Sequence, residues 1–249
     1  RFLTPISGNH AVSLEEFRQC WKTMLSHGPG LEEMYAGKPV GVSVSGGPDS
    51  TALLLLMKRA FPDLSIKGYM VDHAMQSVGV TEETGKYANI LRKDFEVDCR
   101  VLRLDWSDCP LDKLTVGKRM LKAREKRYQS LVDACTEDNV SLLLFGHNLD
   151  DDIVTMMYRM SKFSGIDGLS GMKPLASVPI LHPNAANILI GRPLLNIEKE
   201  RLLETCKSMR VPVNLDESNA CTDYSRNKIL DAMIKLQERD PEMFSTARF

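Results

Sequence analysis

A short glycine-rich segment carries the strongest chemical signal in the sequence. It runs from Ser45 to Ser50, reads Ser-Gly-Gly-Pro-Asp-Ser, and follows the β-branched stretch Val40–Val44. Gly46 and Gly47 carry no side chain, so the backbone there can turn sharply and approach an anion closely. The helix expected after the loop presents free N–H groups and the positive end of its dipole. The segment therefore predicts a phosphate cradle at a helix N-terminus.

The polar residues of this loop have two different chemical uses. The hydroxyls of Ser45 and Ser50 can donate to phosphate oxygens. Asp49 would repel a phosphate, so it either holds the loop or helps to hold a Mg²⁺ ion that bridges phosphates. The alternative is a plain glycine turn, and the segment matches neither a Walker A loop nor the GxGxxG fingerprint. The residues predicted to bind the nucleotide are Ser45, Gly46, Gly47, Pro48, Asp49 and Ser50.

Short apolar runs alternate with amphipathic stretches around and after this loop. Strands are expected at Val40–Val44, Ser65–Val71, Cys99–Leu104 and Ser141–Phe145. Helices are expected at Ser50–Ala60, Thr81–Lys93, Val116–Cys135 and Asp150–Met160. Strands separated by helices of this length predict right-handed crossovers and an α/β fold with a doubly wound parallel sheet.

Two further polar motifs follow strands of this expected sheet. Asp72-His73 comes after the second strand, and Gly146–Asp152 comes after the fourth. Ligands of such sheets lie beyond the carboxyl ends of the strands. We therefore expect these motifs and the glycine-rich loop to form one site.

The two flanks do not follow this alternation. Ser13–Leu25 predicts an amphipathic helix capped by Ser13, with acidic residues in its first turn. A hairpin at Ile180–Leu195 and helices at Glu198–Met209 and Tyr224–Gln237 are expected after the sheet. The sequence thus divides into an N-terminal helical segment (1–36), a nucleotide-binding domain (37–175), and a hairpin with a small C-terminal helical extension (176–249).

Composition argues against several classes of protein. The 249 residues are 43% hydrophobic and 26% charged, and their net charge of −1 does not indicate a nucleic-acid binder. No apolar run approaches the roughly 20 residues of a membrane helix. The six cysteines include no CxxC pair, which disfavours a local zinc or iron–sulfur motif and fits a reducing compartment. Because the chain begins with Arg1, we expect a processed form or a fragment, and residues 1–10 lack the apolar core of a secretory signal.

The loop Ser45–Ser50 resembles the signature of the PP-loop ATP pyrophosphatases, which have Rossmann-like folds. These enzymes cleave ATP between the α and β phosphates and usually adenylate a substrate oxygen. Further strings between about Val40 and Leu230 resemble, in their order and spacing, the tRNA(Ile)-lysidine synthetase family. They are Asp72-His73, Ala123-Arg124 with Arg127-Tyr128, Gly146–Asp151, Gly168–Met172, Arg192–Leu195, and Asp216–Asn219 with Tyr224, Arg226 and Asn227.

This resemblance implies the reaction of an ATP-dependent carbon–nitrogen ligase. ATP would adenylate the wobble cytidine of an isoleucine tRNA, and free L-lysine would then displace AMP. The cofactors implied are ATP and Mg²⁺, and the partners are the anticodon loop of the tRNA and lysine, with no membrane. A cytoplasmic location is expected, with the mitochondrial matrix or another organelle as the alternative. The oligomeric state stays open, a homodimer included.

The resemblance also implies roles for single residues. The loop would hold pyrophosphate, and Asp72 and His73 would lie beside the nucleotide. The reaction centre would contain Asp49, His147, Asp150, Asp151 and Arg192, with Asp49 and Asp151 as ligands of Mg²⁺. Substrate contacts would come from Arg124, Arg127, Arg226 and Asn227. The structural alternatives are capping for His73, Asp150, Asp151 and Asp152, and a surface or clasp role for Arg192, Arg226 and Asn227.

The expected helix Val116–Cys135 has a basic segment that could bind RNA phosphates. Its alternative is a solvated helix face, with Leu121, Ala123 and Tyr128 toward the core. The basic residues are Lys118, Arg119, Lys122, Arg124, Lys126 and Arg127.

Two positions depart from the pattern of the family. The family usually has Asp-Asp-x-x-Glu-Thr, whereas Val154 replaces that glutamate here, so Asp152 would have to compensate. Lys162–Gly165 stands where the family usually has Arg-Gly before a small residue and glycine. Bacterial members usually carry further C-terminal tRNA-binding domains, which we expect to be missing here. Two rivals stay open: a tRNA 2-thiolation enzyme, which the lack of CxxC disfavours, and a catalytically impaired nucleotide- or tRNA-binding homologue.

Overall fold

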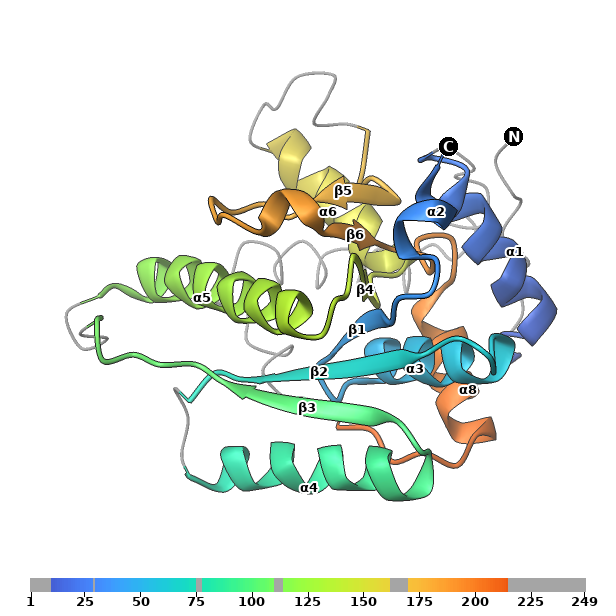
Figure 1. Ribbon diagram of the computed structural model, residues 1–249, viewed down its shortest axis with the longest axis horizontal. Coiled ribbons are helices and arrows are strands. Elements are labelled where there is room, and N and C mark those ends of the chain that lie inside the picture. Colours follow the sequence, from blue (N-terminus) through green and yellow to red (C-terminus); the bar gives the residue numbers. More distant parts are fainter. Residues whose placement is uncertain (1–9, 29, 75–77, 110–113, 162–169, 215–249) are drawn as a thin grey trace, which may run out of the picture.

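The computed structural model describes residues 10–28, 30–74, 78–109, 114–161 and 170–214. Within these ranges one six-stranded sheet runs through the molecule (Figure 1). In spatial order its strands are β3 (Asp98–Arg103), β2 (Ile66–Asp72), β1 (Val40–Val44), β4 (Leu142–Phe145), β6 (Leu189–Gly191) and β5 (Leu175–Ser177). All neighbours pair in parallel except β5, which is antiparallel to β6. The predicted α/β fold with a mainly parallel sheet is confirmed.

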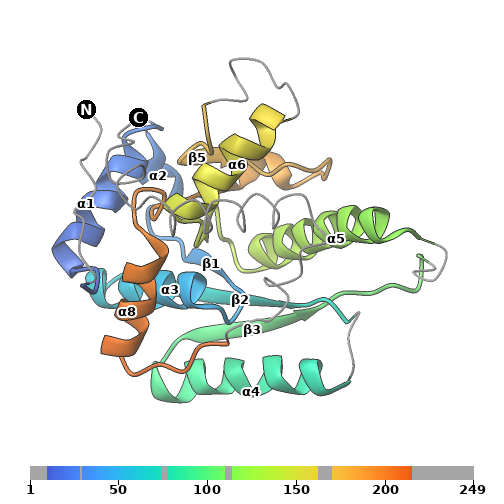
Figure 2. The same cartoon turned by 180° about the vertical axis from the view of Figure 1, so that it is seen from behind.

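Helices cover both faces of this sheet, as Figure 1 and the reverse view in Figure 2 show. They are α1 (Leu14–Leu25), α2 (Leu31–Tyr35), α3 (Pro48–Ala60), α4 (Val78–Asp94), α5 (Val116–Glu137), α6 (Leu149–Ser161) and α8 (Lys199–Ser208), with a 3₁₀ turn at Ala185–Asn187. Strands β1 and β4 are buried along nearly their whole length. Such strands are typical of a parallel sheet that is covered on both sides.

The core has two layers, one on each face of the sheet. The first layer joins α1, α3, α4 and α8, and α3 is its centre because Leu53, Leu54, Leu55 and Leu56 are all at most 2% exposed. The second layer packs α5 and the segment 178–188 on the opposite face, around Tyr128 and Tyr69. The N-terminal helix α1 is therefore part of the main core, because Phe17, Trp21 and Met24 are buried in the first layer.

The predicted elements agree with the structure to within a few residues, with three differences. Helix α3 begins at Pro48, two residues before its expected start, because proline fits the first helical position, where no N–H bond is required. Helix α2 has no counterpart in the prediction. Tyr224–Gln237 lies outside the described residues, and the division at residues 36 and 175 stays a prediction.

The predicted hairpin at Ile180–Leu195 is the third difference, and it is wrong in its position. The antiparallel pair is formed by β5 and β6, so its first strand precedes Ile180, and residues 178–188 form a loop. Pro179 and Pro183 lie in that loop, and proline cannot donate a hydrogen bond to a strand ladder. Val178 and Ile188 instead pack toward α5.

In the described part of the chain, no helix has the length and apolarity needed to cross a membrane.

A buried ion pair fastens the N-terminal helix to α8. The guanidinium of Arg201, whose side chain is 3% exposed, donates to both carboxylate oxygens of Glu16 at 2.6 Å and to the carbonyl of His10 at 3.2 Å. The Val12 N–H also donates to the hydroxyl of Thr205 at 2.9 Å. The bidentate geometry matches the planar fork of arginine to a carboxylate.

We expect Glu16→Ala to destabilise the fold by about 3 kcal/mol, because it leaves the buried guanidinium of Arg201 without its counter-ion. Urea denaturation at pH 7 measures the change. Glu15→Ala is the control, since the Glu15 carboxylate is 85% exposed and lies 3.6 Å from Arg18; its cost should stay below about 1 kcal/mol.

The ion pair between Glu16 and Arg201 also predicts that the stability of the fold depends on pH. The hydrogen bond from Arg201 lowers the pKa of Glu16 below its ordinary value. The stabilisation is therefore complete above the unfolded pKa and is lost as the pH falls through the lower folded pKa. The difference between the wild type and Glu16→Ala should shrink at acidic pH, and a constant difference down to about pH 2 would contradict this origin.

Candidate active site

The glycine-rich loop lies between β1 and α3 and is held by its own serines. The Ser45 N–H donates to the Ser50 hydroxyl at 3.0 Å, and the two hydroxyls also lie 3.0 Å apart. The Ser50 hydroxyl donates to the Gly47 carbonyl at 3.2 Å. Gly46 has a φ of +88°, which disfavours a residue with a side chain. The serines thus shape the loop, while the N-terminus of α3 has no side-chain cap, as an anion site requires.

The end of β4 presses directly against this loop. A methyl group added to Gly146 would lie 2.8 Å from the backbone nitrogen of Ser50 and 2.9 Å from the carbonyl oxygen of Asp49. On another side of the loop, the Asn214 N–H donates to the Gly46 carbonyl at 2.9 Å. The motifs after β1 and β4 therefore lie against each other, as their places in the sequence predict.

Three carboxylates gather where α3, α6 and α8 begin. The pKa of Asp49 is raised to about 6, mainly by burial; the charge of Lys199 lowers it, whereas the charges of Asp151 and Asp150 add to the increase. The Asp49 Oδ1 atom is buried and has no hydrogen-bond partner among the described residues. A buried carboxylate oxygen without a partner indicates a missing ligand or ion.

The other two carboxylates also bind backbone N–H groups. Asn148 caps α6, because its side chain accepts from the Asp151 N–H at 3.0 Å, and Asp151 accepts in return from the Asn148 N–H at 3.3 Å. Asp150 instead accepts from the N–H of Lys199 at 2.9 Å, at the start of α8. The alternative that Asp150 caps its own helix is therefore wrong. No sequence motif points to Lys199, because it lies 49 residues from Asp150 along the chain.

A second set of buried polar atoms lies at the end of β2. Asp72 is 4% exposed, and its Oδ1 accepts from the Ala74 N–H at 2.9 Å. Among the described residues, Asp72 Oδ2, His73 Nδ1 and Arg127 Nε have no hydrogen-bond partner. Burial and the nearby charge of Arg127 lower the pKa of His73. Three buried polar atoms without partners at the carboxyl edge of the sheet favour a ligand there.

Arg127 therefore lies with the residues predicted to bind the nucleotide. Its guanidinium is 5.3 Å from the ring centre of Tyr128 and 5.9 Å from that of Phe145. Burial lowers its pKa. Its neighbour Arg124 is exposed and lies 5.2 Å from the Tyr128 ring centre.

His147 and Arg192 form a fixed pair beside the loop. The His147 ring stacks on Phe145, with ring centres 5.6 Å apart. The Arg192 Nε donates to His147 Nδ1 at 3.2 Å, and its Nη1 donates to the Lys173 carbonyl at 2.7 Å. Two such bonds hold the guanidinium in place, which disfavours the alternative of a freely solvated surface residue.

Comparisons with known proteins identify the family. A family model described as a PP-loop domain matches residues 19–237. The chain belongs to the PP-loop family. The loop Ser45–Ser50 is accordingly called the PP-loop below.

Curated relatives carry a more specific name. The tRNA(Ile)-lysidine synthase of Novosphingobium aromaticivorans is 29% identical over 209 residues, which are 84% of this chain and 60% of that protein. The tRNA(Ile)-lysidine synthase of Hyphomonas neptunium is 34% identical over 176 residues, 69% of this chain and 44% of that protein. The chain thus spans about half the length of these relatives.

Solved structures agree on the fold. A U34-tRNA thiolase from Methanococcus maripaludis has a TM-score of 0.63 at 16% identity, covering 92% of this chain and 75% of that one. An NMN synthetase from Francisella tularensis has a TM-score of 0.53 at 14% identity, with 89% and 87% covered. At these identities the likeness concerns the fold alone.

The basic segment of α5 has two interpretations, an RNA-binding surface or a solvated helix face, and the structure bears on the second of these. Lys126 pairs with Asp108 at 2.6 Å, and Lys122 pairs with Glu125 at 2.8 Å. Leu121, expected toward the core, is 69% exposed, so that expectation is wrong; Ala123 and Tyr128 are buried as expected. A role in RNA binding stays a prediction.

The two positions that depart from the family pattern, and the predicted C-terminal residues, differ in how much the structure describes of them. Val154 is 4% exposed, so the position of the usual family glutamate is buried on α6. The carboxylate of Asp152 instead accepts a hydrogen bond from the Met172 N–H. Arg226, Asn227, Lys162–Gly165 and Asp216–Asn219 lie outside the described residues.

Gly146→Ala should deform the PP-loop, because the added methyl group would overlap backbone rather than a movable side chain. We expect a loss of stability of about 1–3 kcal/mol, together with weaker ATP binding. Urea denaturation and titration calorimetry measure the two effects. Gly117→Ala on α5 is the control, because its methyl group meets no atom within 4 Å and favours the helix.

Asp49→Asn should stabilise the protein without Mg²⁺ at pH 8 by about 1–3 kcal/mol. Below the unfolded pKa the Asp49 carboxyl is neutral in both states, so it does not lower the free energy of unfolding. Because its pKa in the folded protein is raised to about 6, the ionised carboxylate destabilises the fold at higher pH. The gain should vanish toward pH 4. Denaturation in the presence of a chelator tests this, and an equal gain at both pH values would show that charge is not the cause.

Proposed function

We propose that this protein is a tRNA(Ile)-lysidine synthetase that adenylates the wobble cytidine with ATP and then joins lysine to it. The observation that carries the proposal is the meeting of the PP-loop with the His147–Asp151 motif in a chain whose curated relatives are named tRNA(Ile)-lysidine synthases. The PP-loop accounts for the use of ATP, and the motif after β4 supplies the polar groups beside it.

The reaction has two displacements that need no protein nucleophile. The carbonyl oxygen of the cytosine attacks the α-phosphorus of ATP, the bond to the bridging oxygen breaks, and pyrophosphate leaves. The amine of lysine then attacks the carbon that bears this oxygen. The carbon–oxygen bond breaks, AMP leaves with the oxygen, and the amine loses a proton. The protein must therefore hold the reactants in line and stabilise charge on the phosphates.

The N-terminus of α3 and the PP-loop would hold the leaving pyrophosphate. Its N–H groups carry no side-chain cap and point a positive dipole end at the site. His147 would donate to a phosphate oxygen. Because its Nδ1 accepts from Arg192, the proton of the neutral ring lies on Nε2.

The residues present fit a Mg²⁺ ion. Asp49 Oδ1 is buried without a partner among the described residues, and the carboxylate of Asp151 lies near enough to raise the pKa of Asp49. Proteins usually hold Mg²⁺ by one or two carboxylates together with substrate phosphates. Asp49 and Asp151 would hold the ion, which would neutralise charge on the phosphates.

The nucleotide would lie against the end of β2. Asp72 Oδ2 offers an acceptor, and Arg127 Nε offers a donor, and both lack partners in the described part of the chain. The base and ribose of ATP present donors and acceptors that match them. We therefore assign Arg127 to the nucleotide rather than to RNA.

A thiolation enzyme is the rival within the same fold. Such chemistry needs accessible thiolates. Burial raises the pKa of Cys20 and Cys99 to about 11 and that of Cys135 and Cys206 to about 12. These four buried thiols stay protonated at neutral pH, which disfavours them as carriers of sulfur.

Incubation with ATP, Mg²⁺, L-lysine and an isoleucine tRNA should release pyrophosphate and add the mass of one lysine residue to the wobble cytidine. Mass spectrometry of the digested tRNA measures the addition. The same tRNA with uridine at the wobble position is the matched control and should gain nothing, because its carbonyl is not part of the amidine-like system that the amine attacks.

Asp49→Asn should abolish both the release of pyrophosphate and the addition of lysine to the tRNA, because it removes the ionised oxygen beside the phosphates. Unchanged turnover would contradict the role given to Asp49. Bound ATP with no addition to the tRNA would favour an impaired nucleotide-binding homologue instead.

A further inference from the structure

The chain leaves β2 through a turn whose backbone is strained. Ala74 has a φ of +49°, in the left-handed region that residues with a side chain rarely adopt. In the described ranges, three other non-glycine residues share this conformation, and each lies two residues beyond the end of a helix: Glu96, Asn139 and Arg210. There the conformation closes the helix. Ala74 follows a strand instead, so helix capping does not account for it.

The peptide group between His73 and Ala74 is held by both of its polar atoms. Its N–H, that of Ala74, donates to the carboxylate of Asp72 at 2.9 Å. Its carbonyl, that of His73, accepts from the indole Nε1 of Trp106 at 2.7 Å. The first bond is local to the turn, whereas the second comes from a side chain 33 residues further along the chain. Trp106 therefore fixes the peptide group that the strained φ of Ala74 would otherwise release.

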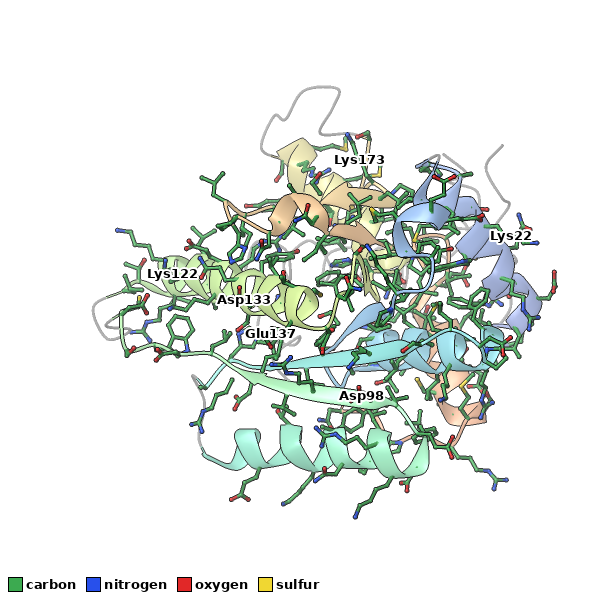
Figure 3. All side chains as sticks on the ribbon, viewed as in Figure 1. Lys22, Asp98, Lys122, Asp133, Glu137 and Lys173 are labelled. Carbon is green, nitrogen blue, oxygen red and sulfur yellow. The ribbon has the colours of Figure 1, made fainter. Side chains whose placement is uncertain are left out.

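Trp106 is itself held against α5. The ammonium group of Lys126 lies 5.6 Å from the centre of the indole ring and pairs with Asp108, in the same loop as Trp106, at 2.6 Å. Figure 3 labels Lys122 one helical turn earlier on this helix, where α5 runs beside the chain that leaves β3. The Lys126 side chain is 12% exposed, and a cation on an aromatic face is worth more when it is desolvated. The loop after β3 is thus a fixed support for the turn.

The turn carries polar atoms that have no partner. Asp72 Oδ2 and His73 Nδ1 make no hydrogen bond with any residue that the structure describes. Both atoms belong to residues whose orientation depends on this turn, and Asp72 is 4% exposed. Strained backbone that several contacts hold in place is typical of sites that are organised before their ligand binds.

We propose that Trp106 is a positioning residue, which holds the turn Asp72–Ala74 in the conformation that receives the nucleotide. The cost of a left-handed alanine is of the same order as the net gain from one hydrogen bond. Without the indole N–H, a large share of the molecules would therefore relax the turn, and the apparent affinity falls with the fraction that stays competent. The inference rests on one part of the proposed function, the binding of ATP against the end of β2.

Trp106→Phe tests the proposal, because phenylalanine keeps an aromatic ring under Lys126 but cannot donate to His73. The dissociation constant for ATP with Mg²⁺ should rise about fivefold, as expected for one lost hydrogen bond, and titration calorimetry measures it. Trp21→Phe is the matched control. Trp21 is the other tryptophan of the chain and is 5% exposed in the core around α1, so its replacement should lower stability and leave the affinity for ATP unchanged.

A second substitution separates positioning from packing. Glycine adopts the left-handed conformation at no steric cost, so Ala74→Gly added to Trp106→Phe should recover most of the lost affinity. If Trp106 only packed against α5, glycine at position 74 would add flexibility to the chain and recover nothing.

The outcomes distinguish this proposal from the proposed function. An unchanged dissociation constant in Trp106→Phe, or no recovery in the double variant, would overturn the proposal and leave the proposed function standing. Both effects in a protein that adds no lysine to tRNA would support the proposal and contradict the proposed function. A wild type that binds no ATP would overturn both.

Discussion

The close approach of Gly146 to the backbone of Asp49 and Ser50 is the contact on which the site depends. Because Gly146 has no side chain, the end of β4 can pack against the PP-loop. A methyl group at Gly146 would lie only 2.8 Å from backbone atoms of Asp49 and Ser50. This packing brings the N-termini of α3 and α6 together, and Asp150 adds α8 through the N–H of Lys199. Phosphate-binding N–H groups and acidic side chains thus meet in one place.

That convergence has an energetic cost which the fold offsets elsewhere. Asp49 is kept partly buried beside two other carboxylates, and its pKa rises to about 6 as a result. Like charges in such a site destabilise the folded state unless a cation or ligand joins them. The strongly apolar α3 and the buried pair of Glu16 with Arg201 supply stability at a distance from the chemistry. The protein can therefore stay folded while its site keeps three carboxylates close together.

The N-terminal helix has two roles in this arrangement. Its buried face completes the core around α3, and its C-terminal half walls the cavity that contains Asp152 and Arg192. Arg192 lines that cavity and also donates a hydrogen bond to His147. The buried face of α1 therefore contributes to stability, while its C-terminal half borders the cavity.

The sequence by itself determined the order of strands and helices, the PP-loop, and the grouping of three motifs at the carboxyl ends of strands, because periodicity, glycine and capping chemistry act over a few residues. It could not place the hairpin, whose prolines shift the pairing to β5, nor decide which way Arg127 and Leu121 face on α5. Only the tertiary structure showed that Asp150 caps α8, that Arg127 turns toward His73, and that α1 walls a cavity with Asp152. Those facts depend on contacts between residues far apart in the chain, and no local pattern encodes such contacts.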